Sequence, residues 1–77
     1  MDGRGVLGRN VLHFRSLRKW SQQDLAGEAA LSLRYLAGIE RGEENPSLAT
    51  IVAISSALGV PVWVLLHPDS EVAGPFI

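Results

Sequence analysis

Two serines near the middle of the chain, Ser21 and Ser32, each stand directly before a stretch with helical spacing of apolar residues. A serine hydroxyl accepts hydrogen bonds from the free N–H groups of a helix's first turn, and Asp24 can return the bond in a capping box. Gly42 follows the second stretch and ends it, because glycine readily adopts the left-handed conformation found at helix C-termini. The pattern predicts two short helices joined by a tight turn.

The rest of the chain predicts three further helices and two end segments. They are a flexible arm over residues 1–5, a helix from residue 6 or 7 to about residue 18, a helix over about residues 48–58 capped by Ser47, a short helix over residues 61–66, and a tail over residues 67–77. In the fourth helix, the side chains expected to face inward are Leu48, Ile51, Ile54, Ser55 and Leu58. The sequence therefore predicts an all-α domain of five helices over residues 6–66.

The composition favours a small cytoplasmic domain. A chain of 77 residues buries only about 60% of its unfolded surface, so a partner subunit would add stability. It contains no cysteine, which excludes disulfides and thiolate metal sites and fits a reducing compartment. No apolar run approaches the roughly 20 residues of a membrane span, so no contact with a membrane is expected.

The net charge of −1 is low for a protein that binds nucleic acid. The charges are unevenly distributed, however. Residues 1–19 carry five basic side chains and one acidic one, whereas residues 20–45 carry two basic and five acidic ones. The basic first segment can still attract phosphate, and we expect weaker non-specific DNA binding than in a basic protein.

Short motifs spread from Leu7 to Leu66 occur in a characteristic order. They are Leu7-Gly8, Ser21-Gln22, Leu25-Ala26, Ile39-Glu40-Arg41-Gly42, Asn45-Pro46-Ser47-Leu48 and Ala57-Leu58-Gly59-Val60. With these motifs the chain resembles the Cro/phage-repressor (XRE-type) helix-turn-helix family. The resemblance implies the five-helix phage-repressor-like fold and binding to double-stranded DNA. The run from Tyr35 to Gly42 also resembles controller proteins of restriction–modification systems.

The resemblance implies that four positions of the third helix read base edges: Leu33, Arg34, Ala37 and Gly38. Only Arg34 can donate a bidentate pair of hydrogen bonds, for which guanine is the best partner. Leu33 and Ala37 can contact thymine methyl groups, and Gly38 would let the DNA approach closely. A phosphate contact or a solvated charge is the alternative for Arg34.

Further positions are expected to contact phosphate: Gln22, Ser32, Arg41 and Asn45. Gln22 and Ser32 stand at helix N-termini, where free N–H groups and the helix dipole favour anions; simple capping is the alternative for both. Glu43 and Glu44 lie where relatives often carry Lys or Arg, so their repulsion should weaken contact in this loop.

Arg15 and Glu40 each directly follow a core residue, Phe14 and Ile39. In the resembling family these two positions form a partly buried ion pair between the first helix and the end of the third. A planar guanidinium suits this role because it can donate two parallel hydrogen bonds to a carboxylate. The alternative is two solvated surface charges.

The short fifth helix is more apolar than an outer helix requires. We expect a dimer interface formed by Val62, Trp63, Val64 and Leu66, since a contiguous exposed apolar patch on a small domain indicates an interaction surface. Alternatively, Trp63 folds back over the core and the tail covers the rest.

These expectations favour a small dimeric transcription regulator on a near-palindromic operator, which acts by excluding or contacting RNA polymerase. The alternative is a protein-interaction module that keeps the fold but has lost DNA readout, as the acidic loop and Gly38 suggest. An enzyme is not expected, because His13 and His67 have no nucleophile beside them and lie on no metal-binding motif. No cofactor or metal is expected. The operator sequence, the regulated gene and the sign of regulation do not follow from the sequence.

Overall fold

Polar side chains begin the first four helices of the protein. The structure is a computed structural model that describes residues 2–69; residue 1 and residues 70–77, which include most of the predicted tail, lie outside the described residues. Within residues 2–69 the helices are α1 (Gly3–Leu17), α2 (Gln22–Glu28), α3 (Leu33–Glu40), α4 (Leu48–Leu58) and α5 (Val62–Leu66). Their N-caps are, in order, Asp2, Ser21, Ser32, Ser47 and Pro61. The prediction of an all-α, five-helix fold is confirmed.

The first helix begins earlier than predicted. The Asp2 carboxylate accepts a hydrogen bond of 3.0 Å from the Gly5 N–H, so residues 3–5 form the first turn of α1. This hydrogen bond holds the pKa of Asp2 below its ordinary value. The prediction of a flexible arm is therefore wrong for residues 2–5, because an N-cap and backbone hydrogen bonding outweigh the low helix propensity of two glycines.

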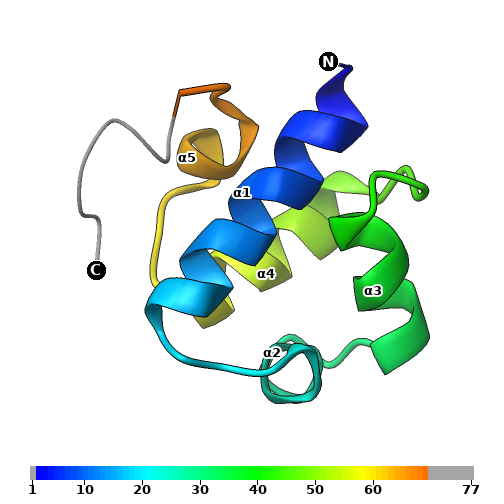
Figure 1. Cartoon of the computed structure of the whole chain (residues 1–77), viewed down its shortest axis with the longest axis vertical. Coiled ribbons are helices and arrows are strands. Elements are labelled where there is room, and N and C mark those ends of the chain that lie inside the picture. Colours follow the sequence, from blue (N-terminus) through cyan, green and yellow to red (C-terminus); the bar gives the residue numbers. More distant parts are fainter. Residues whose placement is uncertain (1, 70–77) are drawn as a thin grey trace.

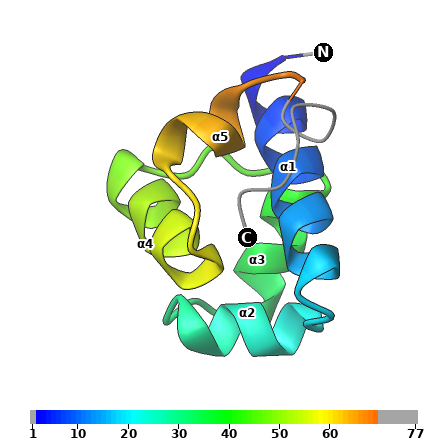
Figure 2. The ribbon, with the colours of Figure 1, turned by 90° about the vertical axis from the view of Figure 1, so that its left-hand side faces the viewer.

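α1 runs along one side of the molecule, in front of α4 in the view of Figure 1. α1 packs against α3, α4 and α5, whereas α2 packs against α3 and α4 and lies across one end of the molecule (Figure 2). Every helix contributes fully buried side chains, among them Phe14, Leu25, Leu36, Ile39, Ile54, Leu58 and Leu65. No helix within residues 2–69 is long and apolar enough to cross a membrane.

α1 and α3 are in close contact at Gly8. A Cβ atom on Gly8 would overlap the carbonyl oxygen of Ile39 and lie 2.7 Å from that of Glu40. Both oxygens belong to the backbone, so neither can move unless α3 moves. The absence of a side chain at Gly8 therefore lets α1 lie directly against the last turn of α3, and this contact sets the position of α3.

The turn between α2 and α3 contains a non-glycine residue in the left-handed conformation. Ala30 has φ 57°, a conformation that costs a non-glycine residue about 1–2 kcal/mol. The Leu31 N–H donates to the carbonyl of Ala26 at 2.8 Å, which closes the end of α2. Leu31 then packs against the core, so the turn keeps the two helices at a defined angle.

One predicted inward-facing residue of α4 is wrong. Ile54, Ser55 and Leu58 are buried and Ile51 is half-buried, but Leu48 is 67% exposed. Leu48 lies on the same stripe of the helix as Ile51 and Leu58. It occupies the first position of α4, and the side chains that cover the rest of the stripe do not extend to this end of the helix.

A buried asparagine on α1 holds the end of α5. The fully buried Asn10 donates from Nδ2 to three carbonyl oxygens, those of Val64 (3.3 Å), Leu65 (2.8 Å) and His67 (2.9 Å). A five-residue helix is not stable alone, so these bonds to its free carbonyls fix α5 on α1. The sequence analysis did not single out Asn10, although a polar residue between Leu7 and Val11 in an apolar seam is a recognisable signal.

Candidate nucleic-acid interface

α2 and α3 form two capped helices with one shared buried side. Ser21 and Asp24 make the predicted capping box, with hydrogen bonds of 2.9 and 3.0 Å, and Ser32 Oγ accepts from the Tyr35 N–H at 3.1 Å. α2 buries Leu25 and Ala26. α3 buries Leu36 and Ile39 on the side that faces the core. The helix lies at the periphery of the molecule (Figure 1), so its outward half is free to approach a ligand.

The outward half of α3 carries three of the four predicted base-reading residues. Leu33 is 47% exposed, Arg34 is exposed and Ala37 is half-buried. At about 100° per residue, Arg34 lies roughly opposite the buried Leu36 and Ile39, whereas Leu33 and Ala37 lie to one side of it, closer to Leu36. The arrangement presents one guanidinium and two apolar groups to the same side.

The prediction for Gly38 is corrected by the structure. Gly38 lies on the outward half of α3 but is buried. The atoms nearest to a Cβ built on it are Glu44 Cγ at 2.9 Å and Glu44 Oε2 at 3.0 Å. The side chain of Glu44 folds over Gly38 from the loop after α3, so the glycine leaves no open space for DNA. The sequence does not reveal this contact, because the path of a loop is not encoded by periodicity.

The predicted phosphate-contacting residues differ in the groups that surround them. Ser32 is exposed, and its hydroxyl caps α3. Arg41 is exposed and forms an ion pair of 3.0 Å with Glu43, whose hydrogen bond raises the pKa of Arg41 and lowers that of Glu43. The positive charge of Arg41 is therefore partly offset within the loop itself.

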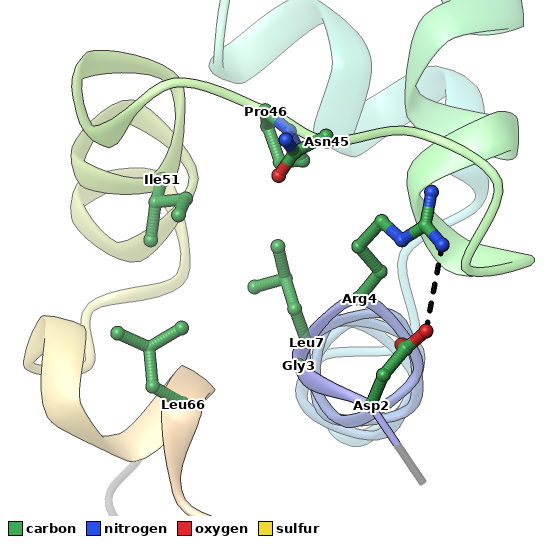
Figure 3. A pocket seen from close by; sticks show the side chains of 8 residues that line it. All are labelled: Asp2, Gly3, Arg4, Leu7, Asn45, Pro46, Ile51 and Leu66. Atoms are coloured by element: carbon green, nitrogen blue, oxygen red, sulfur yellow. Dashed lines mark hydrogen bonds and ion pairs between the residues drawn. The ribbon is translucent and has the colours of Figure 1, made fainter.

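Asn45 is exposed at the edge of an open cleft of about 370 Å³. Figure 3 shows this cleft between the N-terminal turn of α1, the loop before α4, and Ile51 and Leu66 on α4 and α5. Arg4 reaches towards the loop from α1 and is held by an ion pair of 3.5 Å with Asp2.

Gln22 joins a buried hydrogen-bond network behind α3. Its Nε2 donates to Glu40 Oε1 at 2.9 Å, which uses one of the two N–H groups of the amide. Gln22 is half-buried at the first position of α2. The bond orients the side chain and leaves the second N–H group for another acceptor.

The structure brings Arg15 and Glu40 together in the centre of this network. Arg15 Nε donates to Glu40 Oε2 at 2.7 Å and Nη2 donates to Oε1 at 2.9 Å, while Nη1 donates to the carbonyl of Trp20 at 2.8 Å. The side chains are only 13% and 5% exposed, and hydrogen bonding to Glu40 raises the pKa of Arg15. The pair ties α1 and the start of α2 to the last turn of α3.

The predicted dimer-interface residues are only partly available. Trp63 and Leu66 are 55% and 46% exposed and Val62 is half-buried. Val64, however, is completely buried. Its inclusion in the interface was wrong, because the side of α5 that faces α1 and α4 passes through this position. Two further exposed apolar residues, Leu48 and Val52, share one side of α4.

Two capped helices around a fixed turn, with the second helix exposed along its outward half, define a DNA-binding helix-turn-helix domain. Residues 14–62 match the family described as helix-turn-helix. The chain belongs to this family, in its Cro/phage-repressor (XRE-type) branch, whose members are transcription regulators rather than enzymes.

Known proteins of the family are similar over most of this chain. A hypothetical transcription factor of Neisseria meningitidis serogroup B is 39% identical over 70 residues, which cover 91% of this chain and 66% of the relative. The immunity repressor of Bacillus phage phi105 is 46% identical over 65 residues, which cover 84% of this chain and 45% of the relative. This chain thus spans less than two thirds of the length of both relatives.

Solved structures show the same fold. The crystal structure of the hypothetical transcription factor NHTF from Neisseria is 38% identical, with a TM-score of 0.86 over 92% of this chain and 82% of the other. The restriction–modification controller protein C.AhdI from Aeromonas hydrophila is 31% identical, with a TM-score of 0.78 over 80% of this chain and 94% of the other.

Proposed function

We propose that this protein is a transcription regulator that binds double-stranded DNA as a homodimer, with α3 of each subunit in the major groove of one half of a near-palindromic operator. The observation that carries the proposal is the exposed outward half of α3, held from behind by Arg15 and Glu40. A reading helix needs side chains free for base edges and a rigid support that fixes its angle. Contact with RNA polymerase and a cytoplasmic location stay predictions.

Within this proposal, Arg34 reads guanine through two hydrogen bonds, and Leu33 and Ala37 contact thymine methyl groups. Gln22 directs its second N–H group to a phosphate, since Glu40 already orients the amide. Three other residues contact the DNA phosphates more weakly. The hydroxyl of Ser32 caps α3, Arg41 is paired with Glu43, and Asn45 lines the cleft.

Replacement of Arg34 by alanine tests base reading. We expect the preference for the selected operator over random DNA to fall about 5- to 150-fold, which corresponds to the 1–3 kcal/mol of a bidentate arginine–guanine contact. Thermal stability should stay near that of the wild type, since Arg34 is exposed. Operators are first obtained by selection from a random duplex library, and affinities are then measured by fluorescence anisotropy.

Arg41→Ala is the matched control, because it removes an equal charge from the loop after α3. It should weaken binding to all sequences alike and reduce the salt dependence. An unchanged operator preference in the Arg34→Ala variant would remove that residue from the base readers. If wild-type protein retains no duplex DNA even at low salt, the regulator proposal fails and the interaction module remains.

Trp63 is the residue on which we place the dimer interface. A large aromatic side chain that is 55% exposed exposes apolar area that a second copy can bury, and such residues dominate interface energies. Two domains paired through α5 would also present two reading helices about 34 Å apart, as a near-palindromic site requires. The dimer thus supplies both stability and specificity.

We expect Trp63→Ser to raise the dimer dissociation constant about tenfold or more, as measured by sedimentation equilibrium. Leu17→Ser is the control, since Leu17 is 49% exposed on α1, away from α5. It should leave the dimer unchanged. Equal dimerisation of the Trp63 variant and the wild type would place the interface elsewhere.

A further inference from the structure

An acidic side chain occupies part of the surface that the third helix turns outward. Gly38 lies one helical turn after Arg34 on this side of α3, yet it is buried. The three atoms nearest to a Cβ built on Gly38 all belong to Glu44, with Cγ at 2.9 Å, Oε2 at 3.0 Å and Cδ at 3.4 Å. Glu44 therefore stands where a side chain of residue 38 would otherwise stand.

The loop after α3 holds Glu44 in this place. Gly42 adopts φ 77° and its N–H donates to the carbonyl of Ile39 at 3.0 Å, after which the Glu43 N–H donates to the carbonyl of Gly38 at 2.9 Å. These bonds fold the loop back onto the last turn of α3. Pro46 restricts the backbone of the preceding residue, Asn45. The path of the chain at Glu44 is therefore fixed from both sides.

The neighbouring glutamate is differently placed. Glu43 is exposed and pairs with Arg41 at 3.0 Å, which offsets its charge. Glu44 is half-buried against α3. Among residues 2–69 no cation forms an ion pair with it, although it attracts Arg41 at longer range. Two adjacent residues of equal charge thus face different surroundings.

We propose that Glu44 is a base-reading residue of the DNA interface, which presents a carboxylate beside Arg34 in place of a side chain at position 38. This inference rests on the proposed function. A carboxylate in the major groove accepts a hydrogen bond from an exocyclic amino group, that of cytosine N4 or adenine N6. It repels the acceptor edges of guanine and thymine, so it selects partly by excluding the wrong bases.

The spacing places the two readers on neighbouring base pairs. One turn of α3 advances about 5.4 Å, and consecutive base pairs are about 3.4 Å apart. Arg34 therefore selects guanine, and Glu44 selects a base with an exocyclic amino group. The two selected bases lie one or two base pairs apart. An acid in this loop then contributes specificity, although it lowers the overall affinity through repulsion from phosphate.

Glu44→Gln and Glu43→Gln form a matched pair, because each removes one negative charge from adjacent positions. Binding to operators that carry each of the four base pairs at each position is measured for both variants in the full chain. In the Glu44 variant we expect the base preference to fall about tenfold at a single operator position, the one where the wild type favours cytosine or adenine. The four-base comparison tells cytosine from adenine.

The Glu43 variant should raise the affinity for all operators by one common factor. Gly38→Ser provides a second route to the same result, since its Cβ displaces the flexible Glu44 side chain and should relax the same position. Uniform affinity changes in both glutamate variants, with all base preferences kept, would overturn the inference while leaving the proposed function intact. Absence of any DNA binding by the wild type would overturn both.

Discussion

Replacement of Arg15 by alanine is expected to lower the free energy of unfolding by about 3–5 kcal/mol. The loss leaves the Glu40 carboxylate, which is only 5% exposed, with Gln22 as its one remaining side-chain donor among residues 2–69. It also removes the donor to the carbonyl of Trp20. Denaturant unfolding followed by circular dichroism measures the change. DNA affinity should also fall in the folded variant, because the pair fixes the angle of α3.

Two controls separate this buried pair from an ordinary ion pair. Arg41→Ala breaks a pair of the same residue types whose side chains are 57% and 60% exposed, and it should change stability little. The double variant Arg15→Met with Glu40→Leu should be less destabilised than Arg15→Ala, because no buried charge is left without a partner. A stability of Arg15→Ala within error of the wild type would contradict the structural role of the pair.

Replacement of Gly8 by alanine is the second change for which we expect a large effect, a loss of about 3 kcal/mol. In most helices this substitution stabilises by up to about 1 kcal/mol. Here the new methyl group would overlap the carbonyl oxygen of Ile39, and a backbone atom cannot move aside as a flexible side chain can. The strain of inserting a group into a packed interface, about 1–3 kcal/mol and occasionally more, therefore exceeds the gain.

Gly27→Ala is the matched control for this prediction. Gly27 also lies within a helix, but no atom stands within 4 Å of a Cβ built on it. It should stabilise the protein by about 0.5–1 kcal/mol. Thermal unfolding of both variants should thus shift in opposite directions, and a stabilised Gly8 variant would show that α1 and α3 can separate at no cost.

A displaced α3 should also weaken DNA binding in the Gly8 variant. Gly8 contacts the backbone of the last turn of α3, more than one turn beyond Arg34, so the substitution changes no group that is proposed to touch DNA. Any loss of operator affinity in the folded protein then reports the position of the reading helix. The effect is measured at a temperature well below the melting point of the variant.

Local chemistry along the chain determined most of the helix boundaries. Ser21, Ser32 and Ser47 cap the helices that they were predicted to cap, and Gly59 ends α4 in the left-handed conformation. These features depend on a residue and its neighbours three or four positions away, so sequence is sufficient. The exception is Asp2, whose N-cap was overlooked in a segment rich in glycine.

The family resemblance added contacts between distant residues that periodicity cannot supply. It pointed to Arg15 and Glu40 as partners, and the structure joins them across α1 and α3. It pointed equally to Gly38 as a position open to DNA, but Gly38 is buried. The reason lies in this chain's own loop, where Glu44 covers the glycine.

The sequence by itself determined the five helices, the N-caps of α2, α3 and α4 and the outward position of Arg34, because each follows from spacing and from interactions within one turn. Only the tertiary structure decided that Leu48 is exposed, that Val64 is buried, that Asn10 holds α5 and that Glu44 lies over Gly38. Burial and contact across a fold depend on where one helix ends relative to its neighbours. That relation arises when the helices pack, and no single segment contains it.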